Sequence, residues 1–296
     1  MQAGFSGNAQ GVDVSHWQGT IDWPTVAKYK QFAYAEANFG AGYKDPMFVT
    51  YWKDMNKVLH RGAYDFAQPG ETSLTDLFHD AQTECAVFLS QVNAGGGIQS
   101  YDLPVMLDVE QNPHGLTPNQ YVSWMVDWVG CFLGAVPHPW RPPIIYTNEN
   151  FGAWLTKATN LSEIAGWGIW VASYNPNSSP INIGPWTRWT CWQYADNGTV
   201  PGITTAVDLD EWYQGASSFP SWADPTPTPA PAPTITLADL AAELTTVKDA
   251  VNTLGATVKG LEVAVNNQKV AIVGTGDELT ALKTALADVG KVLGGL

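Results

Sequence analysis

Two carboxylic acids, Asp108 and Glu110, end an apolar segment that covers residues 103–109. An apolar run of this length with polar residues behind it indicates a buried strand of a parallel sheet. Because side chains alternate along a strand, both acids are expected on the same side of it. Hydrolysis of a glycosidic bond needs such a pair, one acid to donate a proton and one negative group to meet the developing positive charge. The alternative is structural, with one acid capping a helix and the other exposed.

Glu110 is the better proton donor of the two. Like-charge repulsion from Asp108 would raise the pKa of Glu110 and keep it protonated near neutral pH. Three further acids end apolar segments elsewhere, and they are Asp13, Asp208 and Asp210. The last two could bind a metal together with Glu211, but hard cations usually also take carbonyl or Asn oxygens from a tight loop. No metal and no cofactor is therefore predicted.

Eight strands and five helices are predicted to position these acids. The strands lie at the start of residues 11–23 and at 31–40, 61–69, 103–110, 142–148, 169–174, 187–195 and 206–212. The helices lie near residues 22–30, 45–59, 72–93, 117–134 and 149–158. A helix follows each of the first five strands and none of the last three, which predicts a closed α/β barrel whose second half lacks its helical layer. The acids then meet at the carboxyl end of the barrel.

Composition excludes several partners. The chain has 28 acidic and 14 basic residues and no basic cluster, so neither nucleic acid nor electrostatic binding to a membrane is expected. Its 14 Trp on an acidic background favour a neutral carbohydrate instead. No apolar window is long enough to insert into a membrane, and the first residues lack the features of a secretory signal, so synthesis in a cytoplasm is expected. Three distant cysteines, Cys85, Cys131 and Cys191, are expected to be reduced core residues.

Five segments resemble those of a known family. They are GVDVSHWQGTIDW, GAYDFAQP, LPVMLDVE, WQYADNGTVPGI and VDLDEW. From residue 11 to about residue 213 the chain resembles the glycoside hydrolase family 25 muramidases, lysozymes common among phage endolysins. The resemblance implies an irregular (β/α)5(β)3 TIM-like barrel within residues 1–222 that cuts the β-1,4 bond between N-acetylmuramic acid and N-acetylglucosamine. It also implies catalytic roles for Asp13, Asp108, Asp208 and Glu110, with Glu110 as the acid.

The chain departs from the family at two places near the expected cleft. The family commonly has a basic residue followed by an acid–glycine pair where this chain has EANFG at residues 36–40, and a His in place of Asp65. Aromatic residues near strand ends could stack on sugar rings, although about half should belong to the core. The predicted substrate-binding residues are Trp17, Tyr64, Asp65, Tyr174, Trp192, Gln193 and Asp210. His16 could join them or make a structural hydrogen bond.

The last quarter of the chain has a different composition. Residues 225–233 read PTPTPAPAP, which predicts a semi-rigid linker over residues 223–235. Residues 236–296 contain no aromatic residue, and their apolar residues recur at alternating spacings of three and four. This pattern predicts a coiled-coil tail that joins three or four chains in a homo-oligomer. The alternative is a helical hairpin within one chain that turns at residues 274–276.

Together these features predict an endolysin that is made in the cytoplasm of an infected host and acts on peptidoglycan after release. One rival is a non-catalytic glycan-binding or virion structural protein on the same barrel, suggested by Glu36 and Asp65. A chitinase-like hydrolase is a third possibility, but it requires a longer series of acids on one strand than LPVMLDVE offers.

Overall fold

The structure is a computed structural model that describes residues 7–136, 143–174, 180, 183–213, 215–219, 259 and 283–288. The chain divides into two units, Met1–Pro229 and Ala230–Leu296. The predicted linker and nearly all of the predicted coiled coil lie outside the described residues, so both stay predictions, as do the predicted domain boundaries.

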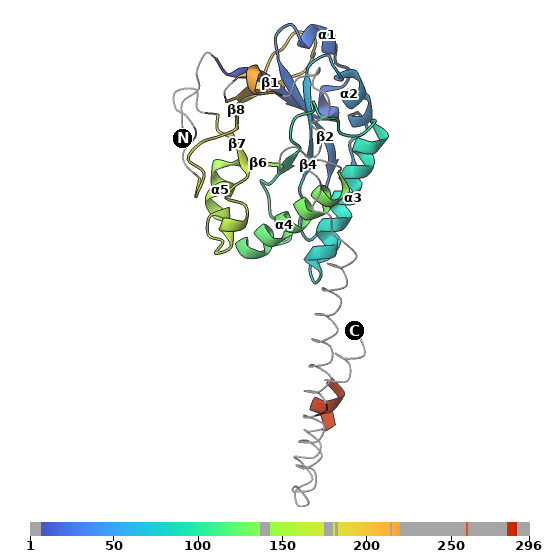
Figure 1. The fold of residues 1–296 in the computed structure, drawn as a ribbon, viewed down its shortest axis with the longest axis vertical. Helices are drawn as coiled ribbons and strands as arrows, with labels where there is room; N and C mark the ends of the chain where they lie inside the picture. The colour runs from blue at the N-terminus through green and yellow to red at the C-terminus, as the bar shows by residue number, and fades with distance from the viewer. Residues whose placement is uncertain are drawn as a thin grey trace, which may run out of the picture. The chain divides into compact units, whose positions relative to one another are not determined.

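Eight strands form a closed barrel in the first unit (Figure 1). They are β1 (Ala9–Val14), β2 (Phe32–Phe39), β4 (His60–Phe66), β5 (Met106–Asp108), β6 (Ile144–Asn148), β7 (Gly168–Ala172), β8 (Cys191–Gly198) and β9 (Val207–Trp212). The strands from β1 to β8 pair in parallel in this order, whereas β9 is antiparallel to both β8 and β1 and closes the ring. A two-residue strand, β3 (Tyr43–Lys44), pairs with the end of β2. The predicted α/β barrel is confirmed, with mixed strand directions.

A helix follows each of the first five barrel strands. These helices are α1 (Trp23–Val26), α2 (Phe48–Asp54), α3 (Leu77–Ala94), α4 (Pro118–Ala135) and α5 (Glu149–Leu155). In Figure 1, α2 and α3 lie outside β2, and α4 lies beside α3. Within the described residues no α-helix follows β7, β8 or β9. Side-chain caps fix where α3, α4 and α5 begin, through Asp76, Thr117 and Asn148. None of the described helices is long and apolar enough to cross a membrane.

Aromatic side chains fill the barrel interior below the carboxyl ends of the strands. Phe32, Tyr34 and Trp170 meet edge to face, with ring centroids 4.8 Å apart for Tyr34 and Trp170. Two glycines make room for these rings, because a Cβ atom would lie 2.3 Å from the Phe32 ring at Gly11 and 2.2 Å from the Tyr34 ring at Gly62. The packed interior closes the lower part of the barrel and leaves polar side chains at its upper end.

Some predicted boundaries were wrong. The strand predicted at residues 103–110 is only Met106–Asp108, so Glu110 lies beyond the sheet. Helix α3 begins at Leu77 rather than near residue 72, because the Asp80 carboxylate accepts hydrogen bonds from the backbone N–H groups of Gly70 and Thr72 and keeps that loop out of the helix. All three cysteines are free; Cys85 and Cys191 are buried as predicted, whereas Cys131 is only partly buried.

Candidate active site

One rim of the barrel, formed by the carboxyl ends of the parallel strands and by the amino end of the antiparallel strand β9, brings four distant acids together. Asp13 lies on β1, Asp108 on β5 and Asp208 on β9, and Glu110 follows β5 by two residues. The negative charges of Glu110 and Asp13 both act on Asp108, and Asp13 and Asp208 share a hydrogen bond. The structure thus gathers all four acids for which a catalytic role was predicted.

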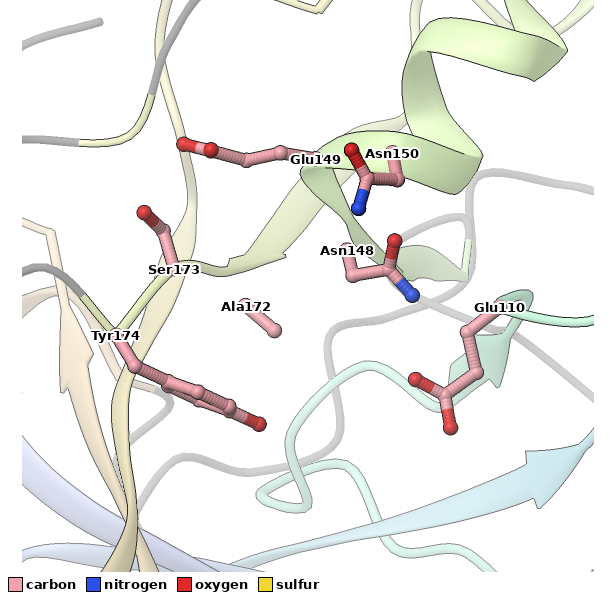
Figure 2. Close-up of a pocket in the computed structure, with 7 residues that line it drawn as sticks. All are labelled: Glu110, Asn148, Glu149, Asn150, Ala172, Ser173 and Tyr174. Carbon is pink, nitrogen blue, oxygen red and sulfur yellow. The ribbon is translucent and has the colours of Figure 1, made fainter.

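Glu110 lies in an open pocket of about 560 Å³ between β5, β6 and β7. The pocket is lined by Glu110, Asn148, Glu149, Asn150, Ala172, Ser173 and Tyr174. Figure 2 shows the Asn148 side chain turned toward Glu110, and the Tyr174 hydroxyl pointing toward Glu110 from the other side of the pocket. Partial burial raises the pKa of Glu110, while a hydrogen bond with the Asn148 side chain lowers it. Glu110 therefore combines access to a ligand with a tendency to keep its proton.

The cause predicted for this pKa shift was wrong. Burial, not repulsion from Asp108, raises the pKa of Glu110. Asp108 lies deeper, and its own pKa is raised well above its usual value, first by burial and then by the charge of Glu110. Its Oδ1 atom is buried and has no hydrogen-bond partner within the described part of the chain. Because an unpaired buried carboxylate is costly, Asp108 is the group that retains a proton and so exerts little charge on Glu110.

Asp13 and Asp208 form a carboxyl pair on the opposite wall. Burial and the charge of Asp13 raise the pKa of Asp208 to about 9, and burial raises the pKa of Asp13 as well. Two carboxyl groups in contact cannot both ionise readily, so the pair retains at least one proton near neutral pH. Asp13 is the better anion, because Gln193 donates a hydrogen bond from Nε2 to its Oδ2 atom at 2.7 Å.

Gln193 is itself held by two tyrosines. Its Oε1 atom accepts hydrogen bonds from the hydroxyl groups of Tyr146 at 2.8 Å and Tyr174 at 2.6 Å. Both tyrosines donate to the amide oxygen, so the amide nitrogen must face Asp13. Gln193 therefore lies in the site as predicted, but between protein side chains rather than as a free sugar-binding group.

The predicted substrate-binding residues differ in how accessible their side chains are to a ligand. Trp17, 75% exposed, and Tyr174, 48% exposed, are accessible to a ligand. Tyr64 is buried in the barrel interior, where its hydroxyl donates to Glu36 at 3.4 Å. Asp210 is fully buried beside Asp13, and burial followed by the charge of Asp208 raises its pKa. A residue so deep cannot touch substrate, so its predicted role was wrong.

Asp65 and Trp192 point away from the barrel interior. Asp65 is 0% exposed and accepts a hydrogen bond from Asn38 Nδ2 at 2.7 Å. Its carboxyl group lies against that of Glu84 on α3, and the two form a buried carboxyl pair. Trp192 donates from Nε1 to the Ser173 carbonyl at 2.8 Å and belongs to the outer core. Both predictions of substrate contact are corrected, because adjacent residues on a strand face opposite sides and Tyr64 and Gln193 take the inner positions.

Several site residues were missed. Asn148 ends β6 in the same way that Asp108 ends β5, so the rule that selected the acids could have selected it. Tyr146, two residues earlier on β6, pairs with Asp108 in the sheet. Glu36 was noted only as a departure, yet it lies half-buried beside Tyr64, and burial followed by the charge of Asp45 raises its pKa to about 7. Within the described residues, the donors close enough to share an ion are those of His16, Glu36 and Asp45, not those of Asp208, Asp210 and Glu211.

Comparison with known proteins agrees with this geometry. Residues 12–203 match the model of the family described as Glycosyl hydrolases family 25. The chain is 32% identical over 225 residues to Lysozyme M1 of Streptomyces globisporus, an alignment that covers 73% of this chain and 72% of that protein. The crystal structure of the bacterial lysozyme from Streptomyces coelicolor has 30% identity and a TM-score of 0.61 over 73% of this chain and 96% of its own. The spore cortex lytic enzyme SleM of Clostridium perfringens has 25% identity and a TM-score of 0.64 over 74% and 71%. The chain therefore belongs to family 25 of the glycosyl hydrolases and is a glycoside hydrolase of the lysozyme, or muramidase, type.

Proposed function

We propose that the protein hydrolyses the β-1,4 bond between N-acetylmuramic acid and N-acetylglucosamine in peptidoglycan, with Glu110 as the proton donor. The observation that carries the proposal is the position of Glu110. Among the four gathered acids it is the one that lines the open pocket, and burial raises its pKa. An acid that is accessible and holds its proton can protonate the oxygen of the leaving sugar.

The other acids take different parts in this proposal. The Asp13–Asp208 pair supplies one negative charge opposite Glu110, where positive charge develops on the sugar ring. Gln193 keeps that charge on Asp13 by its hydrogen bond of 2.7 Å. Asp108 lies below Glu110 and, because it is protonated in the free enzyme, it orients Glu110 and the bound sugar rather than adding a second charge.

Product analysis tests the proposal and separates it from the rival glycan-binding function. Purified protein is incubated with peptidoglycan, and the soluble products are identified by mass spectrometry. New muramic acid reducing ends, absent with Glu110→Gln, support the enzyme. Reducing ends on N-acetylglucosamine would identify another bond specificity. Binding to peptidoglycan with no soluble fragments would identify the non-catalytic rival.

We further propose that the protein acts as an endolysin, made in the cytoplasm of a bacterial host and acting on the wall after release. The support is the joining of a wall-degrading barrel to a second unit of different composition through the PTPTPAPAP segment. Expression of the protein inside bacteria, with and without a membrane-permeabilising agent, tests this role. Lysis that needs both the protein and the agent is expected, and lysis by the agent alone at the same rate would contradict it.

The tail is proposed to join several barrels into one particle. Residues 234–296 contain seven acidic and five basic residues, so most of the net charge of −14 belongs to the preceding part. An acidic barrel is repelled by an anionic wall, and linking several weak sites raises retention through effective concentration. Light scattering of the full chain should give a mass of three or four chains. The mass of one chain at micromolar concentration would favour the helical hairpin instead.

A further inference from the structure

Three side chains from separate elements form a mixed nitrogen and oxygen cluster near the upper end of β2. His16 lies just after β1, Glu36 on β2, and Asp45 just after β3. One donor atom from each side chain lies within 4.8 Å of the other two. The cluster shares no residue with the acids proposed to cleave the glycan.

Asp45 is held in a fixed orientation within this cluster. Its side chain is buried, Oδ2 accepts a hydrogen bond from the backbone N–H of His16 at 2.7 Å, and Oδ1 accepts from that of Met47 at 2.8 Å. Gln91 of α3 donates from Nε2 to the carbonyl oxygens of both Ala37 and Asp45, at 3.2 and 3.1 Å. These bonds tie the β3–α2 turn to β2, so the distance between Asp45 and Glu36 is set by the fold.

Glu36 faces the barrel interior by the ordinary alternation of β2, two residues after Tyr34 and opposite Tyr64. The register shift between β2 and β4 comes after Glu36 and changes the direction of Asn38, which pairs with Asp65. The Tyr64 hydroxyl steadies the Glu36 carboxylate at 3.4 Å. Glu36 and Asp45 are close enough to repel one another, and His16 is the group between them that can carry positive charge. The cluster therefore has two carboxylates and one imidazole in a partly buried place.

We propose that His16, Glu36 and Asp45 bind a divalent transition-metal ion, with Zn²⁺ preferred. An imidazole nitrogen and two carboxylates suit zinc, whereas Ca²⁺ and Mg²⁺ take oxygen ligands. His16 Nδ1 lies 3.0 Å from Asp45 Oδ2, which matches two ligands that each stand about 2.0–2.1 Å from one ion. The ion would replace the proton of that hydrogen bond and cancel the repulsion between the carboxylates. Three protein ligands leave a fourth position open to water.

Metal titration of the full chain tests this proposal without any glycan, so its result is independent of the proposed function. The protein is stripped with a chelator, exchanged into metal-free buffer at pH 7.5, and titrated with ZnCl₂, CoCl₂, CaCl₂ and MgCl₂ by calorimetry. One Zn²⁺ per chain is expected, with Co²⁺ binding at the same stoichiometry and showing a visible absorption band. Zinc should also raise the melting temperature followed by tryptophan fluorescence.

Conservative variants locate the ion. His16→Gln and Glu36→Gln should each weaken Zn²⁺ binding by at least about tenfold, and circular dichroism verifies that they fold. His79→Gln is the matched control, because His79 and Asp76 form an exposed His–Asp pair, 2.6 Å from Nδ1 to Oδ2, outside the cluster. The proposal is overturned if no Zn²⁺ binds, if binding is the same in His16→Gln and Glu36→Gln, or if Ca²⁺ or Mg²⁺ binds as tightly as Zn²⁺.

Discussion

Gln193 holds Asp13 through a hydrogen bond of 2.7 Å from its amide nitrogen to the Asp13 carboxylate. The amide cannot turn over, because its oxygen accepts from both Tyr146 and Tyr174. The ionisation state of one wall of the site therefore depends on a residue that carries no charge and lies on another strand, 180 positions away in the sequence.

Gln193→Met is expected to lower kcat with little effect on KM. The substitution keeps the side-chain volume and removes the donor to Asp13, so the negative charge is no longer fixed there. A hydrogen bond to a charged group is worth about 1.5–3 kcal/mol, which corresponds to about 10- to 150-fold in rate. Steady-state kinetics measure the effect. Tyr174→Phe, which removes one of the two bonds to Oε1, should cost less, and an equal loss would show that Tyr174 acts directly on the substrate.

Glu110→Gln should abolish glycan cleavage without unfolding the barrel. The amide has the same shape but cannot give a proton to the leaving sugar, and general acid catalysis accounts for about 10²–10⁴ in rate. Release of reducing ends is the measurement. Glu149→Gln is the matched control, since Glu149 lines the same pocket and is assigned no proton transfer. Cleavage by Glu110→Gln at a rate near that of the unchanged protein would remove Glu110 from the role of acid.

Asp108→Asn separates two explanations for the proton on Glu110. Burial raises the pKa of Glu110, and the raised pKa of Asp108 favours its neutral form, so removing the Asp108 carboxyl should take away little negative charge. The basic limb of the kcat/KM profile, which reports loss of the Glu110 proton, should therefore move by less than about 0.5 pH unit, while kcat falls. A clear downward shift of that limb would show that Asp108 is ionised and repels Glu110.

The strand order and the meeting of four acids could be predicted because both follow from topology. In a ring of parallel strands the carboxyl ends share one face, so Asp13 and Asp108 had to approach one another wherever the loops ran. Asp208 joins them for another reason, because β9 is antiparallel and its amino end lies at that face. The two-residue strand β3 and the early end of β5 could not be predicted, because they depend on contacts between distant segments. The cluster of His16, Glu36 and Asp45 could not be predicted for the same reason, since its three residues come from separate parts of the chain.

The errors over Asp65 and Trp192 have a local cause. Alternation along a strand was applied to Asp108 and Glu110 but not to Tyr64 with Asp65 or to Trp192 with Gln193. Two adjacent residues on a strand cannot both face the barrel interior, so one residue of each pair had to point outward. Which member does so depends on the register of the strand. The pKa of Glu110 is raised by burial, and the burial of a side chain cannot be read from the residues next to it in the sequence.

Asp65→Asn tests the corrected position of Asp65. The Asn oxygen can still accept from Asn38, and its amide group can donate to Glu84, so the buried pair no longer contains two carboxyl groups. Burial and then the charge of Asp65 raise the pKa of Glu84, and each unit of such a rise costs about 1.4 kcal/mol at high pH. The variant should therefore melt at a higher temperature than the unchanged protein at pH 8. Its kcat/KM should be little changed. A large loss of activity with unchanged stability would return Asp65 to the substrate site.

The barrel should be more stable near pH 5 than near pH 8. The pKa values of Asp13, Asp108 and Asp210 are raised well above the usual range and that of Asp208 is raised to about 9, whereas an unfolded Asp titrates near about 3.9. Between these values the folded chain binds more protons than the unfolded chain, so the free energy of unfolding falls as pH rises. The stabilisation is complete below about pH 4 and is lost as pH rises through the folded pKa values.

The size of this effect can be bounded and assigned to one group. One proton contributes at most about 1.4 kcal/mol per pH unit, and solvent screening at the partly exposed Asp208 reduces that figure. For a domain of this size each 1 kcal/mol changes the melting temperature by about 2–4 °C.

Tryptophan fluorescence reports the barrel alone, because residues 223–296 contain no Trp. Asp208→Asn should flatten the decline between pH 5 and pH 8, while Asp54→Asn, at an exposed position on α2, should leave it unchanged. A melting temperature that rises over this range would mean that these acids are ionised in the folded protein and that the shared proton of Asp13 and Asp208 does not exist.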